Sequence, residues 1–386
     1  MPEPPAGDSE MESCMEIYVH IPFCLRKCRY CDFLSFPCSG EEKRQYLSAL
    51  EQEIAECGRG RGEGAVSSIY FGGGTPSLLS GEEMKDLMES LDRQFLLAPE
   101  AEITMEANPG TLTASGLAGY REAGINRLSI GCQSVHDSEL SMLGRIHRYG
   151  DFQESYRMAR EAGFANINVD LMYGLPGQTA ASWWQSLETV CGLAPEHISA
   201  YSLIVEEGTP FADMDLDLPD EDAERQMAAD AVEVLADHGY ARYEIANFAR
   251  PGFACRHNIG YWDGTPYISF GLGASSYMDQ TRWRNTRSIE NYLKNAASPA
   301  CLRRDVEILT IESRMEEFMF LGLRMTAGVS KSEFAKRFGV SMNEVYGEKI
   351  EHFVREKLLT NSGDRVFLTG RGLDLANVVM AEFLLD

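Results

Sequence analysis

Short runs rich in β-branched and aromatic residues recur through the first two thirds of the 386-residue chain, with helical periodicity between them. The hydrophobic pattern predicts strands over Ile17–Ile21, Val66–Phe71, Glu102–Ala107, Arg127–Gly131, Ile167–Tyr173 and Ile198–Ile204. It predicts helices over Glu41–Cys57, Glu82–Phe95, Leu112–Glu122, Asp151–Ala162 and Ala181–Val190. A regular alternation of strand and helix favours parallel strands with right-handed crossovers, which is an α/β fold of the partial (β/α)6 barrel type.

The polar residues that follow these strands support a barrel. In α/β barrels the chemistry lies at the carboxyl ends of the strands. Five candidate positions occur there, in the order Cys24, Gly72–Thr75, Glu106, Gln133 and Asp170. The sequence therefore predicts that these groups converge on one site.

The regular alternation stops at about Tyr240, and the end of the chain has another pattern. It predicts helices over Glu312–Met325, Lys331–Phe338 and Asn343–Lys357, a hairpin over Leu358–Leu368 and a last helix over Arg371–Leu384. This order is typical of a winged-helix arrangement. The predicted organisation is a flexible N-terminal tail (1–14), a barrel domain (15–240) and a smaller α+β C-terminal domain with winged-helix-like character (241–386).

Charge and hydropathy restrict the partners and the compartment. The formal net charge of −24 argues against binding to nucleic acid, because an acidic surface repels phosphates. No apolar run approaches the roughly 18 residues of a membrane span, and the N-terminus has neither a signal nor a transit pattern. We expect a cytoplasmic protein whose ten cysteines are thiols or metal ligands rather than disulfides.

The segment HIPFCLRKCRYCDF carries the strongest chemical signal. Its cysteines Cys24, Cys28 and Cys31 have C-x3-C-x2-C spacing. Three thiolates can hold three irons of a [4Fe–4S] cluster, which usually takes four cysteines. The fourth iron then stays open to a chelating molecule, and the amino and carboxylate groups of S-adenosylmethionine (SAM) suit it. The alternative is a zinc site with Cys38 as fourth ligand, although a second cysteine pair is missing.

Weaker signals surround this motif. In YFGGGTPS three consecutive glycines allow a ligand to approach the backbone closely, and the missing G-K-[ST] ending excludes a P-loop. The isolated polar residues Glu106, Gln133, Arg145 and Asp170 are each compatible with a structural role. A carboxylate can also accept ribose hydroxyls, and an arginine can pair with the carboxylate of SAM.

Taken together, the phrases YVHIPFC, FGGGTPS, EANPG, GCQS, GR and DLMYGLPGQ resemble the successive motifs of a known family. This is the oxygen-independent coproporphyrinogen III oxidase family of the radical SAM superfamily. The resemblance covers the chain from Tyr18 onward. It implies a radical SAM barrel and contacts with SAM from Tyr18, Tyr30, Gly73, Gly74, Thr75, Glu106, Gln133, Arg145, Asp170 and Ile204.

Two features favour the HemW-type haem chaperone branch of this family. Phe33 stands where the oxidases carry a last cysteine, and the string H-N-x-x-Y-W characteristic of that branch is present as His257, Asn258, Tyr261 and Trp262. The branch binds haem and delivers it to haem proteins. His257, Tyr261 and Trp262 are therefore haem-binding candidates. Histidine is a common axial haem ligand, but a lone histidine is also common as a hydrogen-bonded core residue, and Cys255 and His147 are weaker alternatives.

The resemblance thus implies a haem chaperone that holds a [4Fe–4S] cluster, SAM and haem. Its partners would be haem-accepting proteins and a reductant of the flavodoxin or ferredoxin type. The sequence identifies no catalytic residue. Two alternatives share the same SAM residues: coproporphyrinogen III oxidation in porphyrin biosynthesis, and another radical SAM reaction such as methyl transfer.

Overall fold

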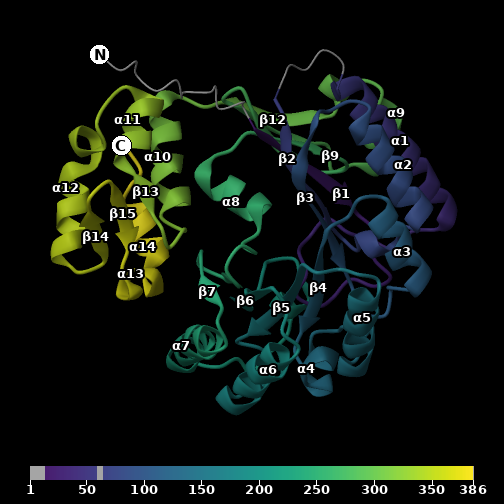
Figure 1. Ribbon diagram of the computed structural model, residues 1–386, viewed down its shortest axis with the longest axis horizontal. Coiled ribbons are helices and arrows are strands. Elements are labelled where there is room, and N and C mark those ends of the chain that lie inside the picture. The colour runs from purple at the N-terminus through teal and green to yellow at the C-terminus, as the bar shows by residue number, and fades with distance from the viewer. Residues whose placement is uncertain (1–13, 59–63, 386) are drawn as a thin grey trace, which may run out of the picture.

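The computed structural model describes residues 14–58 and 64–385. The predicted tail (1–14) therefore lies outside the described residues except for Cys14. A twelve-stranded sheet forms the larger part of the molecule, and a group of helices with a three-stranded sheet stands beside it (Figure 1). Within the described ranges, none of the helices combines the length and the apolar character that crossing a membrane requires.

The six predicted strands are all present and pair in parallel in chain order, which confirms the predicted partial barrel. They are β1 (Met15–Ile21), β2 (Val66–Gly73), β3 (Leu97–Ala107), β4 (Arg127–Gln133), β5 (Ile167–Tyr173) and β6 (His197–Ser202). The connecting helices are α1 (Gly40–Gly58), α2 (Gly81–Asp92), α3 (Ala114–Glu122), α4 (Asp137–Met142), α5 (Tyr149–Glu161), α6 (Ala180–Gly192) and α7 (Glu221–Asp237).

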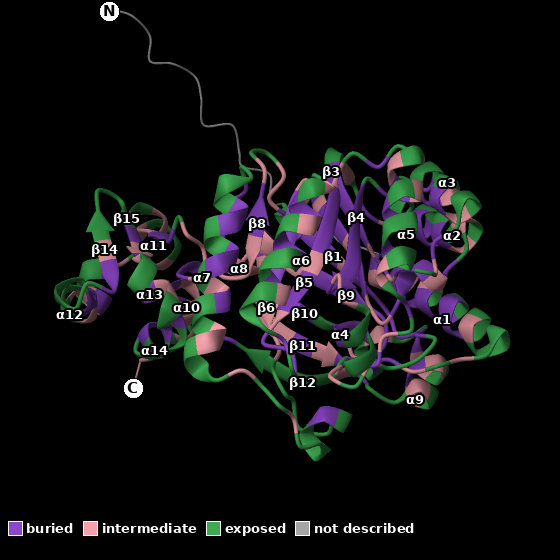
Figure 2. Ribbon diagram, turned by 90° about the horizontal axis from the view of Figure 1, so that it is seen from below, coloured by how far each residue is buried: buried purple, intermediate pink, exposed green. Residues whose placement is uncertain are grey.

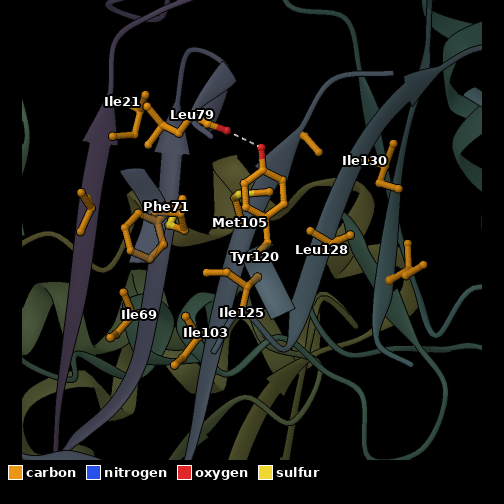
Figure 3. Close-up of a cluster of buried hydrophobic side chains, with 14 of the residues drawn as sticks. Ile21, Ile69, Phe71, Leu79, Ile103, Met105, Tyr120, Ile125, Leu128 and Ile130 are labelled. Atoms are coloured by element: carbon orange, nitrogen blue, oxygen red, sulfur yellow. Dashed lines mark hydrogen bonds between the residues drawn. The ribbon is translucent and has the colours of Figure 1, made fainter. Parts of the chain in front are cut away.

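Successive side chains along each strand point to opposite faces of the sheet, and the two faces have different environments. Side chains such as Ile69, Phe71 and Ile103 point to the outer face, where they pack beneath the helices (Figure 3). There Tyr120 of α3 lies among them and donates its hydroxyl to the Leu79 carbonyl at 2.5 Å. The helices bury one face on the strands and expose the other (Figure 2). The inner face of the sheet carries polar side chains instead, so the barrel encloses a polar interior.

The sheet continues beyond the predicted domain boundary at residue 240. Its strand order is β12-β11-β10-β9-β1-β2-β3-β4-β5-β6-β8-β7. The added strands are β7 (Ala241–Arg242), β8 (Asn247–Ala249), β9 (Tyr267–Phe270), β10 (Ser275–Met278), β11 (Thr281–Asn285) and β12 (Arg303–Ile308). Both edges of the barrel sheet are thus extended by later chain. The predicted domain boundary at residue 240 stays a prediction. Strands from both sides of this boundary belong to the same hydrogen-bonded sheet.

Two helices lie in the same part of the chain as these added strands. Helix α8 (Arg256–Asp263) lies between the barrel and the C-terminal helices, and α9 (Ile289–Asn295) packs on α1 (Figure 1). Neither helix was predicted from the sequence, because each is only two turns long and shows little periodicity. Helix α8 contains the H-N-x-x-Y-W string.

A second hydrophobic core lies in the C-terminal part, around Phe334, Tyr346 and Phe383. Its elements are α10 (Ile311–Gly322), β13 (Val329–Ser330), α11 (Lys331–Phe338), α12 (Met342–Arg355), β14 (Leu359–Ser362), β15 (Arg365–Leu368), α13 (Gly370–Asp374) and α14 (Ala376–Ala381). The winged-helix-like order is confirmed. The predicted single last helix is wrong, because Leu375 has φ −113° and ψ 23° and separates two short helices.

Candidate functional site

The cysteine loop follows β1 and is closed at its base by backbone hydrogen bonds. Phe36 donates its N–H to the Pro22 carbonyl at 2.8 Å, and Cys24 donates to the Phe36 carbonyl at 3.1 Å. Midway, the Arg29 N–H donates to the Leu143 carbonyl at 3.0 Å, which ties the loop to the end of α4. The loop therefore has a fixed position at the carboxyl end of the strands.

The three thiols of this loop line one cavity. Cys24 is buried, whereas Cys28 and Cys31 are partly exposed. Burial raises the pKa of Cys24 and of Cys31, so a positively charged group is needed to stabilise their thiolates. None of the ten cysteines, all of which the structure describes, forms a disulfide.

The geometry does not support the zinc alternative. Within residues 14–58 and 64–385, no three His, Cys, Asp or Glu side chains are placed to hold a single metal ion. Cys38, the proposed fourth ligand, does not line the cavity. All three thiols line a cavity of about 470 Å³, which has room for a larger group with several metal atoms.

The cavity has a volume of about 470 Å³ and extends from the cysteine loop into the barrel. Its walls include, besides the three cysteines, most of the predicted SAM contacts: Tyr30, Gly73, Gly74, Thr75, Glu106, Gln133, Arg145, Asp170 and Ile204. Ile204 is 66% exposed and lies at the rim. A larger hollow of about 800 Å³ on the outer face, beside α2 and α3, contains none of the predicted site residues. The predicted convergence therefore occurs in the cavity that the cysteines line.

Two carboxylates on the barrel strands, Glu106 of β3 and Asp170 of β5, line this cavity. Glu106 accepts hydrogen bonds from the Tyr70 hydroxyl at 3.0 Å and from the Gly73 N–H at 3.1 Å. Burial, together with the neighbouring Asp170, raises the pKa of Glu106 to about 7. Asp170 accepts from Asn168 at 2.7 Å, and its own pKa is raised by burial. The pair can accept hydroxyl donors from a bound molecule.

Arg145 brings a positive charge to the thiols. Its Nη2 donates to Asn108 Oδ1 at 2.7 Å and to the Gly131 carbonyl at 2.8 Å, and its Nη1 lies 3.7 Å from Cys28 Sγ. Its Nε is buried and has no hydrogen-bond partner in the part of the chain that the structure describes. The guanidinium is thus held between the loop and the strand ends, with donor capacity remaining for an anionic group.

The glycine turn after β2 is explained by contacts within the protein. Gly73 has φ +112°, and a Cβ there would lie 2.4 Å from the His20 ring. A Cβ at Gly74 would lie 2.5 Å from the Phe23 carbonyl oxygen. Both glycines also line the cavity. Glycine is therefore needed at both positions because the backbone packs closely against the segment that leads into the cysteine loop. A ligand that approaches this backbone would need the same space.

Tyr18 is the one predicted SAM contact that does not line the cavity. Its hydroxyl lies 3.1 Å from His20 Nδ1, and its ring stacks on Tyr70 with centroids 6.3 Å apart. It therefore supports Tyr70, which does line the cavity and contacts Glu106.

The haem-binding candidates lie behind the cavity wall. His257 is 1% exposed; its Nδ1 is 2.8 Å from Ser68 Oγ and its Nε2 is 3.1 Å from Tyr261 Oη. The Glu16 carboxyl is 3.6 Å from Nδ1. Burial raises the pKa of Glu16 to about 9 and lowers that of His257 to about 3, so the contact joins two neutral groups.

Tyr261 packs against His257 and Tyr267, whereas Trp262 contacts the C-terminal part. The ring of Trp262 lies 4.3 Å from the guanidinium carbon of Arg324. Among the H-N-x-x-Y-W residues, Asn258 lines the cavity and the three predicted candidates do not. Of the weaker alternatives, Cys255 contacts Glu102 and His147 contacts the Cys132 carbonyl, and both are buried.

Several cavity residues were not predicted from the sequence, namely Tyr70, Asn108, Arg127, Ser129, Asn168, Tyr201 and Asn258. A signal for some of them existed. Side chains two positions apart on a strand share a face. Asn168 is therefore expected on the same face as Asp170, and Ser129 and Arg127 on the same face as Gly131. Asn258 had no such signal, because its helix comes from a part of the chain far from the barrel strands.

The donor set fits the groups that a radical SAM protein holds. Three thiols surround an open space beside a cation with an unpartnered nitrogen, and two carboxylates follow deeper in the barrel. A cluster on the thiols would leave one position for a chelating molecule, and the remaining polar walls suit its ribose.

Comparison with known proteins gives the same picture. Residues 18–190 match the radical SAM superfamily, and residues 309–375 match the HemN C-terminal domain. The haem chaperone HemW of Bacillus subtilis is 40% identical over 374 residues, which cover 95% of this chain and 98% of the relative. The HemW of Escherichia coli is 34% identical over 382 residues, covering 96% and 98%.

Among solved structures, coproporphyrinogen III oxidase (HemN) from Escherichia coli, a radical SAM enzyme, matches with a TM-score of 0.85. The match covers 97% of this chain and 90% of that chain at 24% sequence identity, so it shows a common fold.

Proposed function

The chain belongs to the radical SAM superfamily and, within it, to the family of the HemW haem chaperones, and from this membership we propose that it binds haem and delivers it to haem proteins. The carrying observation is the continuous match to the haem chaperones over the whole length of both chains. The match includes the C-terminal part as well as the barrel. The oxidase fold alone does not favour oxidase activity, because the two functions share that fold.

As a radical SAM protein the chain takes a [4Fe–4S] cluster and SAM. We assign the cluster to Cys24, Cys28 and Cys31, which come from one loop and line one cavity. When bound, the cluster supplies an electron that can cleave SAM to a carbon radical. Arg145 places its charge beside Cys28, which stabilises the thiolate form of the loop.

We assign SAM to the walls deeper in the same cavity. Glu106 and Asp170 accept the ribose hydroxyls, and Gly73, Gly74 and Thr75 provide the backbone that faces the methionine end. The remaining assigned contacts are Tyr30, Gln133, Arg145 and Ile204. Tyr18 takes part indirectly, through Tyr70. These roles are supported by the common cavity and by the chemistry of each group.

The haem ligand stays a prediction. For His257 to coordinate iron, one of its two hydrogen bonds has to break and α8 has to move, because the ring is inaccessible in the described geometry. Delivery requires a haem-accepting protein, and reduction of the cluster requires a carrier of the flavodoxin or ferredoxin type. We place the protein in the cytoplasm and infer no nucleic-acid partner, as the charge of −24 indicates.

A single preparation tests the proposal. The protein is purified anaerobically, its iron and sulfide are reconstituted, and haem is titrated while the Soret band is followed. The same sample is tested for coproporphyrinogen turnover with SAM and a reductant. We expect stoichiometric haem binding without turnover, and transfer of the haem to an apo-haem protein. Robust turnover without lasting haem binding would identify an oxidase instead.

A further inference from the structure

Arg127 is a buried cation without a hydrogen-bonded partner among the described residues, although the charges of Glu102 and Asp170 act on it. It is the first residue of β4, its side chain is 2% exposed, and its Nε is buried without a hydrogen bond. Within the described ranges its guanidinium forms neither an ion pair nor a hydrogen bond, yet it lines the cavity. The unused terminal nitrogens therefore open toward the cavity space.

The carboxylates nearest in the fold are engaged elsewhere. Glu102 accepts from the Arg256 N–H at 3.0 Å and from the Cys255 thiol at 3.4 Å. Asp170 accepts from Asn168 and from Ser129. A buried guanidinium that lacks a hydrogen-bonded anion is unfavourable, and the fork of five N–H donors matches a carboxylate bidentately. The position of Arg127 thus suits an anionic group that a ligand brings.

Asn258 of α8 contributes a second open polar group to the same cavity. It lines the same cavity, is half-buried, and its side-chain amide makes no hydrogen bond within the described part of the chain. Thr104, two residues after Glu102 on β3, pairs with Arg127. Because Glu102 holds the first N–H of α8, this helix begins beside Arg127 and directs Asn258 to the same end of the cavity.

We propose that Arg127 and Asn258 bind a carboxylate at the inner end of the cavity, and that this carboxylate is a propionate of the bound tetrapyrrole. The inference rests on the proposed haem-binding function. SAM also has a carboxylate, but its chelating end belongs at the cysteine loop, beyond Gln133 at the other end of β4. A seven-residue strand spans roughly 20 Å. A propionate sits on a short two-carbon arm, so the edge of the macrocycle has to lie inside the barrel, close to Arg127.

The test uses the full-length reconstituted protein and two ligands that differ only at the propionates, haemin and its uncharged dimethyl ester. Both are titrated into the wild type, Arg127→Gln and the control Arg93→Gln, which replaces an exposed arginine directly after α2. We expect the wild type and the control to bind haemin at least about tenfold tighter than the ester, as a charge-assisted bond implies. We expect Arg127→Gln to lose this preference while its affinity for the ester is unchanged.

Two further experiments distinguish a carboxylate of the tetrapyrrole from the carboxylate of SAM. Asn258→Asp places a negative charge in the site, so it should weaken the binding of haemin and leave the binding of the ester unchanged. This variant takes the place of Arg127→Gln in the test if Arg127→Gln does not fold. SAM and decarboxylated SAM are titrated into the same proteins. If Arg127→Gln weakens SAM alone and leaves the haemin preference intact, the site binds SAM and the tetrapyrrole assignment is wrong.

The remaining outcomes are also distinct. Equal binding of haemin and ester by the wild type would overturn the carboxylate site and leave the haem-binding function standing. Failure of both ligands to bind would overturn the proposed function itself.

Discussion

Asn258 and Trp262 lie one helical turn apart on α8 and have different neighbours, since Asn258 lines the cavity and Trp262 packs beneath Arg324 at 4.3 Å. His257, the residue before Asn258, is hydrogen-bonded to Ser68 of β2. Helix α8 therefore connects the cavity, the inner face of the barrel and the C-terminal part. A string that the sequence associates with haem binding is, in the structure, also a connection between these three regions.

The Trp262–Arg324 contact should couple stability to ligand binding. We expect Arg324→Met to lower the free energy of unfolding by about 1 kcal/mol or more, because the cation–π contact and the 4.0 Å ion pair with the buried Glu244 are lost while the apolar stem is kept. Urea titration measures the change. We also expect weaker haem binding, because α8 is held less firmly. Arg303→Met, which removes a similar contact with Trp283 at 4.2 Å on β11, is the control and should leave haem affinity unchanged. Equal haem effects in both variants would contradict the coupling.

His257 allows two interpretations that one variant separates. Both ring nitrogens are bonded and the ring is buried, so His257→Ala should destabilise the fold by about 2–3 kcal/mol. In the described geometry the haem spectrum of the folded variant should not change. If the Soret band shifts and the haem affinity falls while the fold persists, His257 is an axial ligand and α8 moves on binding.

Much of this fold could be predicted because its strands follow simple rules. All six barrel strands and most barrel helices have the expected periodicity, and glycines end several of them. The inner face was harder to predict. Polar residues such as Ser68, Ser129 and Asn168 interrupt the apolar runs without any chemical motif, although they alternate with Ile69 and Val169 on the outer face. Reading each strand with period two would have found them.

Other features were out of reach of local patterns. Strands β9 to β12 are short, and whether they join the edge at β1 or form a separate sheet depends on long-range pairing. Helix α8 is placed by a hydrogen bond from Arg256 to Glu102, 154 residues apart. The position of Asn258 at the cavity, beside an Arg127 that has no hydrogen-bond partner among the described residues, follows from that placement. Such relationships exist only once the chain is folded.

The cluster assignment predicts a difference among neighbouring cysteines. Replacing Cys24, Cys28 or Cys31 by serine should abolish the iron content and the visible absorbance after reconstitution, because three thiolates are the minimum set for the cluster. Cys38→Ser is the matched control, since Cys38 lies near the same loop but does not line the cavity. Iron and sulfide analysis measures the result. Loss of iron in Cys38→Ser would indicate that Cys38 is a ligand.

The pKa of Glu106 predicts how SAM binding depends on pH. Burial and Asp170 raise this pKa to about 7, so the carboxylate that accepts ribose hydroxyls forms only as the pH rises through neutrality. We expect SAM to bind up to about tenfold more weakly at pH 6 than at pH 8. Glu106→Gln should bind SAM weakly at both values, without the pH dependence. Calorimetric titration measures both proteins. An unchanged pH dependence in Glu106→Gln would assign it to another group.

Glu53 of α1 should control how the stability of the barrel edge varies with pH. It is 2% exposed and accepts hydrogen bonds from the Gly271 N–H at 2.8 Å, the Tyr292 hydroxyl at 2.7 Å and Asn285 Nδ2 at 2.6 Å. These partners belong to the strands and helix added beyond β1. Burial raises the pKa of Glu53 to about 7 although the hydrogen bonds oppose the shift.

The direction of the effect follows from proton linkage. Below the ordinary pKa of 4.5 Glu53 is protonated in both states and has no effect on stability. Between 4.5 and about 7 the folded protein binds more protons than the unfolded chain, so the free energy of unfolding falls as the pH rises, by on the order of 3 kcal/mol in total. Glu53→Gln cannot titrate, so its urea midpoint should vary less between pH 5 and pH 8. Glu89→Gln, an exposed substitution on α2, should keep the wild-type slope. If Glu53→Gln keeps that slope too, the carboxylate is ionised throughout this range, and its three hydrogen bonds outweigh the cost of burying the charge.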